Sequence, residues 1–242
     1  MYIPSSFNVE DESEQIKLIR ENPLGIIFNC GKGSSGNSSF WNPLKGTRAS
    51  PSFSDLHATH VPFVFEENES GKHKIKTHLA AKNHHVEILE ESPQCLVVFQ
   101  GPHSYISPSW YPLKKKTHKF VPTWNYSAVH VYGTAHVVKN KEALLEFLEQ
   151  VTDQEEGKRP EGEAYEEKWK LSDAPAAYID AKLKSIVLLE IEIDHMEGNF
   201  KYSQGDPKQN VEGIIENLET EVSGENGRKV ASLIREHYPQ QL

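Results

Sequence analysis

Short segments with the alternating or β-branched pattern of strands recur along this chain, separated by turn residues. The strongest is residues 126–138, which is rich in Val and Tyr. Further strands are predicted at residues 24–28, 56–65, 74–79, 95–99 and 186–193. Gly133 predicts a bulge in the strongest segment, and Pro62 predicts a sheet edge or a bulge in another. The strands do not alternate with helices, which argues against a doubly wound parallel sheet.

Helical patterns lie at the two ends of the chain and in its middle. In residues 141–152, for example, Leu144, Phe147 and Leu148 recur at helical spacing. Other helices are predicted at residues 10–21, 176–184, 210–218 and 228–237. The expected fold class is therefore mainly β with appended helices (α+β), with the strands closing into a β-barrel.

The length of 242 residues favours a single domain. We expect residues 1–152 to form its core, with an insertion at residues 29–55 that is rich in Gly, Ser, Asn and Pro. Residues 154–162 read as a charged, linker-like break. Residues 153–242 would then supply a C-terminal strand and helices that complete the same domain.

The charge balance limits the choice of partners. The formal net charge is −9, which does not favour a broad surface for the phosphates of nucleic acid. The lysine-rich residues 114–119 are the exception, and a solvated loop tip is their simpler explanation. Cys30 and Cys95 are expected to be reduced, and neither a signal peptide nor a membrane span is predicted. We therefore expect a cytoplasmic protein without a membrane partner.

The 12 histidines invite a metal hypothesis, but their spacing does not support it. His57 and His60 would point to opposite faces of a strand, and no cysteine or carboxylate pattern completes a ligand set. We expect no metal. His60, His78 and His103 are acid or base candidates only because imidazole titrates near neutrality, so the catalytic residues stay unassigned.

Two aromatic stretches, residues 101–111 and 122–126, are expected to lie in loops. A flat heteroaromatic ligand needs ring faces on its flanks and polar groups at its edge. The ring faces would come from Tyr105, Trp110, Trp124 and Tyr126, and the polar groups from Ser107, Ser109 and Asn125. A rigid dimer contact, in which Trp and Tyr are also enriched, explains the same composition equally well.

Residues 77–84 follow a predicted strand and can open a helix. The start of a helix carries unpaired N–H groups and can hold a phosphate. Lys82 would add charge and Asn83 a hydrogen bond. The alternative is an ordinary strand-to-helix turn with a surface lysine.

These stretches resemble the PaiB-type family, described as FMN-binding negative transcriptional regulators. The resemblance extends over nearly the whole chain and rests on residues 1–7, 58–62, 78–83, 101–111, 121–133 and 196–204. Two departures stand out at the turn. The family usually has a basic residue where this chain has Ala81, and the basic residue here is Lys82; His84 replaces a proline.

The resemblance implies a split β-barrel of the FMN-binding type, similar to pyridoxamine phosphate oxidase, that binds FMN at the interface of a homodimer. The strand at residues 58–62 would lie along the isoalloxazine, and residues 78–83 would hold the phosphate. Residues near Trp124 would come from the partner subunit or close against it. The expected cofactor-binding residues are Thr59, His60, Val61, His78, Ala81, Lys82, Asn83, Tyr105, Ser107, Trp110, Trp124, Asn125 and Tyr126.

Three functions fit this pattern. The first is a regulatory or redox-sensing FMN protein, for which DNA binding and a nuclear location follow only from the resemblance. The second is an FMN-dependent oxidoreductase or flavin reductase with a small-molecule redox partner, in which the cofactor carries the chemistry. The third is a split barrel that binds or degrades heme. The sequence therefore leaves open whether the protein is an enzyme.

Overall fold

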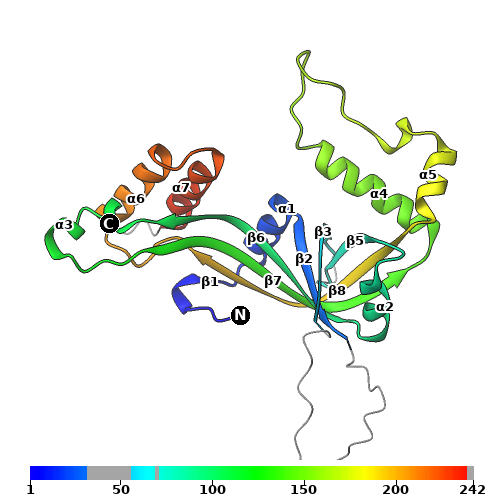
Figure 1. Ribbon diagram of the computed structural model, residues 1–242, viewed down its shortest axis with the longest axis horizontal. Coiled ribbons are helices and arrows are strands. Elements are labelled where there is room, and N and C mark those ends of the chain that lie inside the picture. Colours follow the sequence, from blue (N-terminus) through cyan, green and yellow to red (C-terminus); the bar gives the residue numbers. More distant parts are fainter. Residues whose placement is uncertain (32–55, 69–70, 239–242) are drawn as a thin grey trace, which may run out of the picture. The chain divides into compact units, whose positions relative to one another are not determined.

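The computed structural model describes residues 1–31, 56–68 and 71–238 (Figure 1). In these residues the strands form one eight-stranded sheet in the order β3-β2-β6-β7-β8-β5-β4, with β1 pairing to β8. The predicted α+β class, mainly β with appended helices, is confirmed. The insertion predicted at residues 29–55 lies, from residue 32 onward, outside the described residues.

The strands are β1 (Asn8–Val9), β2 (Leu24–Cys30), β3 (Leu56–Pro62), β4 (Val64–Glu66), β5 (Lys74–Ala80), β6 (Gln94–Ile106), β7 (Thr123–Val138) and β8 (Ile186–Lys201). The helices are α1 (Glu12–Glu21), α2 (His84–Glu91), α3 (Lys114–Thr117), α4 (Lys141–Glu156), α5 (Ala176–Leu183), α6 (Lys208–Thr220) and α7 (Glu225–His237). Short 3-10 helices occur at Ser5–Phe7, Pro108–Trp110 and Leu171–Asp173.

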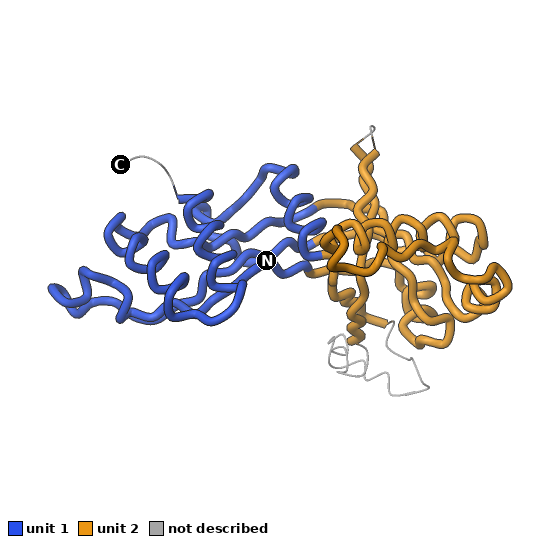
Figure 2. Tube along the Cα trace, turned by 90° about the horizontal axis from the view of Figure 1, so that it is seen from above, with its two compact units in different colours: residues 1–22, 99–130, 196–242 blue, residues 23–98, 131–195 orange. Residues whose placement is uncertain are grey.

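The chain divides into two compact units, shown in different colours in Figure 2. Unit 1 comprises Met1–Asn22, Phe99–His130 and Met196–Leu242, and unit 2 comprises Pro23–Val98 and Val131–His195. The long strands β6, β7 and β8 each supply residues to both units. Each unit is described below by itself.

In unit 2 the outer strands of the sheet are β3 and β4. Pro62 is the last residue of β3, so it lies at a sheet edge, one of the two positions predicted for it. β3 pairs with β2 along its full length, from Leu56 opposite Cys30 to Pro62 opposite Leu24. The helices α4 and α5 cover a cluster made by Leu144, Phe147, Leu183 and Leu188. Gly133 of β7 lies so close to the Glu192 carbonyl of β8 that a Cβ atom would clash with it, which accounts for the glycine.

In unit 1, α1 begins at a capping residue, because the Asp11 side chain accepts a hydrogen bond from the Ser13 N–H. Its apolar face buries Ile16, Leu18 and Ile19. The helices α6 and α7 pack against each other (Figure 1). A Cβ atom at Gly213 of α6 would clash with the Trp110 carbonyl, so α6 lies directly against the 3-10 helix at Pro108–Trp110.

The expectation that both aromatic stretches lie in loops is wrong for residues 101–106 and 123–126, which are in strands, and it holds for residues 107–111, which lie beyond the end of β6. β6 continues to Ile106 and β7 begins at Thr123. The residues from 103 to 106 alternate between exposed and buried, with Ser104 and Ile106 inside, which is the period of a strand. Of the aromatic residues that suggested loops, His103 and Tyr105 are the outward-facing members of that alternation.

Two other boundaries differ from the prediction. α4 extends to Glu156, so the expected break begins only at Gly157, because Gln and Glu are good helix formers even where nothing packs on them. β8 runs on to Lys201, well past the predicted end at residue 193. Its second half alternates less regularly, and pairing with β1 holds it extended.

Candidate functional site

The start of α2 lies against β3 in unit 2. The Thr59 Oγ1 of β3 is 2.7 Å from the His85 Nδ1 of α2. Asn83 caps α2, because its Oδ1 accepts a hydrogen bond from the His85 N–H at 3.0 Å. The sequence predicted the strand, the turn and the helix start, and the structure brings Thr59 and the turn together through His85.

Three imidazoles gather at this point. The ring centroid of His57 on β3 lies 5.8 Å from that of His84 and 5.9 Å from that of His85. Burial, followed by the charges of His57 and His84, lowers the pKa of His85 to about 4. His85 is therefore neutral at pH 7. His84 is exposed and its Nδ1 lies 3.0 Å from the Glu87 carboxylate.

The backbone of the turn commits most of its donors. The N–H groups of Ala81 and Asn83 donate to the carbonyls of Ser185 and Ala80. The Val86 N–H donates to the Asn83 carbonyl, and the Asn83 side chain takes the His85 N–H. Within the described residues, the N–H groups of Lys82 and His84 have no such acceptor.

The uncommitted groups at this turn are almost all donors. They are the Lys82 ammonium, the Asn83 side-chain N–H₂, two backbone N–H groups and the His57 imidazole. The His84 imidazole already faces the Glu87 carboxylate. A donor set at a helix start fits a phosphate monoester, so the turn suits the phosphate end of FMN. We call residues 57, 59 and 81–85 the histidine turn.

The other predicted residues of unit 2 lie on either side of this turn. On the outer strand β3, His60 is exposed and Val61 is half-buried. On β5, the His78 ring lies 5.8 Å from Phe147 of α4, and burial lowers its pKa. The adjacent Thr77 faces the other way and donates to the Pro62 carbonyl of β3. His78 thus packs under α4, whereas its neighbour meets β3.

In unit 1, the side chains of His103, Tyr105 and Trp124 form an exposed aromatic group, which we call the aromatic platform. Trp124 is 52% exposed and Tyr105 is 44% exposed. The Trp124 ring lies 6.2 Å from Tyr105, edge to face, and 5.9 Å from His103. Two strands, β6 and β7, present these rings to solvent.

The remaining predicted residues of unit 1 have partners inside the unit. Trp110 is buried and donates from Nε1 to Glu221 at 2.9 Å. Asn125 is fully buried and donates to the Ser203 hydroxyl at 3.1 Å. The Tyr126 hydroxyl accepts from Asn199, and Ser107 caps the 3-10 helix by accepting from the Ser109 N–H. These contacts give the four residues structural roles in the chain itself.

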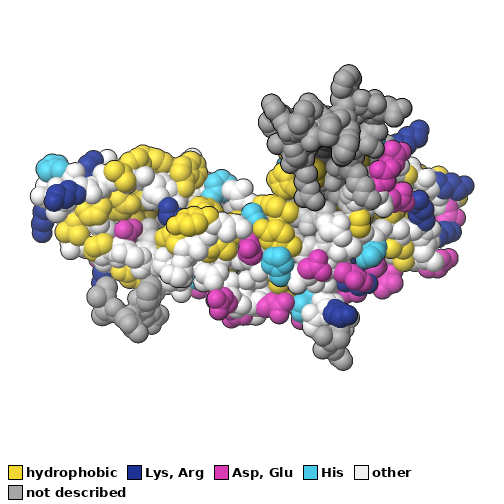
Figure 3. All heavy atoms as spheres, turned by 90° about the horizontal axis from the view of Figure 1, so that it is seen from below, with side chains coloured by type: hydrophobic (Ala, Val, Ile, Leu, Met, Phe, Trp, Pro, Cys, Tyr) yellow, Lys and Arg dark blue, Asp and Glu magenta, His cyan; other side chains and the backbone are white. Residues whose placement is uncertain are grey.

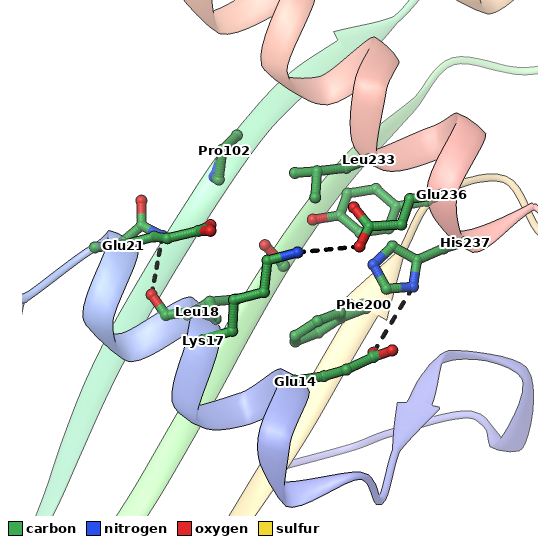
Figure 4. A pocket seen from close by; sticks show the side chains of 12 residues that line it. Glu14, Lys17, Leu18, Glu21, Pro102, Phe200, Leu233, Glu236 and His237 are labelled. Atoms are coloured by element: carbon green, nitrogen blue, oxygen red, sulfur yellow. Dashed lines mark hydrogen bonds and ion pairs between the residues drawn. The ribbon is translucent and has the colours of Figure 1, made fainter. Parts of the chain in front are cut away.

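A small cavity in unit 1 lies between α1, α7 and the strands (Figure 4). Two ion pairs close it, with Lys17 at 3.0 Å from Glu236 and His237 at 3.8 Å from Glu14. Its volume of about 30 Å³ is enough for water but far too small for an isoalloxazine ring. This cavity is therefore no flavin site.

The surfaces of the two units differ in composition. In Figure 3 hydrophobic side chains gather over the left part, which belongs to unit 1, while acidic and basic side chains are mixed over the right part. In the part of the chain that the structure describes, no group of three or more His, Cys, Asp or Glu side chains is arranged so that it could hold a metal ion. None of the described helices is both long and apolar enough to cross a membrane.

Sequence reasoning missed the grouping of His57, His84 and His85. Spacing along the chain could not show that β3 lies beside α2. The available signal was local: a capping Asn83 followed by two histidines at the first positions of a helix.

Solved structures share this fold. A conserved hypothetical protein of Mycobacterium tuberculosis matches with a TM-score of 0.52 at 14% identity, covering 86% of this chain and 94% of that one. An FAD and heme binding protein from Mycobacterium smegmatis matches with a TM-score of 0.50 at 12% identity, covering 85% and 78%. The antiparallel sheet with its helices is a split barrel, as the fold class predicted from the sequence requires.

Sequence comparison gives the family within that class. The family model described as "Putative FMN-binding domain" matches residues 1–195. "Protease synthase and sporulation protein PAI 2" of Bacillus subtilis is 30% identical over 242 residues, which covers 100% of both chains. An uncharacterized protein of Saccharomyces cerevisiae is 50% identical over 164 residues, covering 67% of this chain and 95% of its own. The chain belongs to the PaiB-type family of FMN-binding split barrels, and its cofactor is FMN.

Proposed function

We propose that this protein is a homodimeric FMN-binding split barrel with a regulatory or redox-sensing role. The observation that carries the proposal is the histidine turn, where Thr59 of β3 lies 2.7 Å from His85 at the start of α2. A strand edge for the flat ring and a donor-rich turn for the phosphate thus meet within unit 2. The regulatory role is supported by the Bacillus subtilis relative, which is named "Protease synthase and sporulation protein PAI 2".

Each group would have a separate task. Lys82, Asn83 and the His84 N–H would bind the phosphate, while the neutral His85 would orient the Thr59 hydroxyl. Residues 59–61 on the outer strand β3 would supply backbone donors and acceptors to the polar edge of the ring, because an outer strand has one unpaired side. FMN, once bound, supplies reversible electron transfer, and the protein residues bind and orient it.

The aromatic platform supports the dimer. Tyr105 and Trp124 expose large rings in an otherwise polar chain, and exposed aromatic groups of this kind mark interaction sites. A second copy of this chain would cover the platform and place it near that copy's flavin. The exposed rings would thus contact the second copy, whereas Trp110 and Asn125 are already buried against partners in their own chain.

One purified sample tests the proposal. Titration with FMN should quench the flavin fluorescence and saturate at one FMN per chain, and light scattering should give twice the chain mass. Riboflavin, which lacks the phosphate, should bind more weakly. A sample that neither quenches FMN nor retains a flavin spectrum would overturn the FMN site at the histidine turn.

A second measurement separates a regulator from an enzyme. Multiple turnovers of NADPH or NADH oxidation by the FMN-loaded protein would favour a flavin reductase. Slow, single-turnover reduction of the bound flavin would favour a sensor. A gel-shift at physiological salt tests DNA binding, for which the short basic helix α3 is the one local support on the described surface. In this role we expect the protein in the cytoplasm or the nucleus.

A further inference from the structure

Unit 1 contains a second pocket at the end of β8, remote in sequence from the histidine turn. Its volume is about 390 Å³, which lies within the ~300–1,000 Å³ range of small-molecule sites. Its lining includes Phe7, Phe120, Thr123, Lys201 and Asp206. We call it the Lys201 pocket.

Four stretches of sequence meet at this pocket. Phe7 ends residues 1–7, Tyr111 ends residues 101–111, Val121 begins residues 121–133, and Lys201 lies in residues 196–204. These are four of the stretches that carry the resemblance to the PaiB-type family. None of the four side chains belongs to the histidine turn, so the proposed flavin site does not account for their meeting here.

Lys201 carries a charge that no carboxylate of the described residues balances at ion-pair distance. Its Nζ donates to the Thr123 Oγ1 at 2.6 Å and lies 5.9 Å from the centre of the Phe7 ring. By contrast, the partly buried Lys74 and Lys76 of unit 2 are paired with Glu190 and Glu66. A partly buried ammonium usually has an anionic partner, so Lys201 is suited to an anion from outside the chain.

The backbone beside Lys201 is held in an uncommon conformation. Ser203 has a φ of 63°, in the left-handed region of the backbone that residues other than glycine rarely adopt. The buried Asn125 holds the Ser203 hydroxyl, and the Gln204 side chain bonds the backbone of both Phe200 and Tyr202. A strained residue that its neighbours fix in place is typical of a functional site.

The walls of the pocket are mainly apolar, and Asp206 adds one negative charge to them. The Tyr111 and Phe120 rings lie 5.1 Å apart. Burial, and then the charge of Asp206, raises the pKa of Tyr111 to about 12, which keeps its hydroxyl protonated. Lys119 and Lys201 against Asp206 leave one net positive charge in the lining. One positive charge with apolar walls suits a monoanion that has an apolar body.

We propose that the Lys201 pocket binds a small organic carboxylate with an aromatic or aliphatic body. Lys201, oriented by Thr123, binds the carboxylate. Phe7 and Phe120 contact the apolar body, and Lys119 adds to the attraction from the rim. The proposal does not depend on the FMN site.

Benzoate and its neutral analogue benzamide test this site in the FMN-loaded, full-length protein. Saturation-transfer NMR and calorimetry should show benzoate binding, with benzamide at least tenfold weaker. Lys201→Met should weaken benzoate roughly tenfold or more, because a charge-assisted hydrogen bond is lost. Lys201→Arg, which keeps the charge, should bind benzoate within a few-fold of the wild type.

The matched control is Lys115→Met, which removes an exposed lysine of α3 that does not line the pocket. It should leave benzoate binding unchanged. A thermal melt confirms that each variant is folded. Equal binding of benzoate and benzamide, absence of benzoate binding, or wild-type affinity in Lys201→Met overturns the proposal. A Lys201→Met variant that loses FMN while the wild type binds no benzoate would assign the pocket to the flavin instead.

Discussion

The histidine turn of unit 2 and the Lys201 pocket of unit 1 are two ways of preparing a site for an anion. The histidine turn relies on a helix start, backbone N–H groups and imidazoles, one of which, His85, is kept neutral by burial. The Lys201 pocket relies on an ammonium group next to aromatic walls. In the proposed roles, the first would place backbone, amide and Lys82 donors around a phosphate, and the second would offer the charge of Lys201 to a smaller anion.

The difference predicts how each region responds to conditions. Salt screens the attraction of the exposed Lys82 at the turn more than that of the half-buried Lys201 in the pocket. A buried imidazole makes the turn sensitive to acid, and a lysine does not titrate in the same range. Variants can therefore separate the two regions, and the expected effects are given from the largest to the smallest.

The largest effect should come from His85 in acid. Its pKa falls from the usual 6.5 to about 4 on folding, so the unfolded chain takes up the proton first as the pH falls. Stability is therefore full above pH 6.5 and is lost progressively toward pH 4, by up to about 3 kcal/mol. Urea unfolding across this range measures the loss.

His85→Gln should flatten that pH dependence, while His118→Gln, at an exposed position of unit 1, should leave it as it is. If the wild type is equally stable at pH 7 and pH 4.5, His85 is not held neutral by burial. The contrast between the two anion sites would then lose its main support.

The second effect concerns the buried support of the Lys201 pocket. Asn125→Leu removes the partner of the Ser203 hydroxyl and should lower the free energy of unfolding by about 1–3 kcal/mol. It should also weaken benzoate, because the left-handed backbone at Ser203 is no longer held. Asn8→Leu, at an exposed position, is the control and should change stability by less than about 0.5 kcal/mol. Unchanged stability in Asn125→Leu would show that this hydrogen bond does not hold the turn.

The third effect distinguishes binding of the FMN phosphate from binding of the isoalloxazine ring at the histidine turn. Lys82→Ala should weaken FMN roughly tenfold, equivalent to about 1.4 kcal/mol, and leave riboflavin unchanged. Fluorescence titration with both flavins measures the difference. Lys72→Ala removes another exposed lysine of unit 2 and should affect neither flavin. An equal loss for FMN and riboflavin would place Lys82 at the ring and not at the phosphate.

The smallest effect concerns the rim of the Lys201 pocket. Lys119 is exposed, so Lys119→Met should weaken benzoate only about two- to threefold, and the effect should vanish in high salt. Calorimetry at low and high salt measures it. A loss as large as that of Lys201→Met would mean that the two lysines bind the carboxylate equally.

The cofactor family and most local elements could be predicted from the sequence, because both depend on residues close together in the chain. The helix at α4 follows from Leu144, Phe147 and Leu148, and the capped start of α2 follows from Asn83. The loop assignment was wrong for residues 101–106 and 123–126. The Gly, Pro and Ser residues among the aromatic ones favoured loops, but β6 and β7 pair with each other and extend as strands through these residues.

The sequence by itself determined the chemistry that each side chain can offer and the capped start of α2, since side-chain type and local capping need no tertiary contact. Only the tertiary structure decided which of them meet. It put His85 against Thr59, turned His78 toward Phe147, and buried Asn125 against Ser203. It also left Lys201 without a carboxylate partner in the described residues. The physical reason is that pairing between distant strands, which spacing along the chain does not encode, sets both the burial and the partner of each polar group.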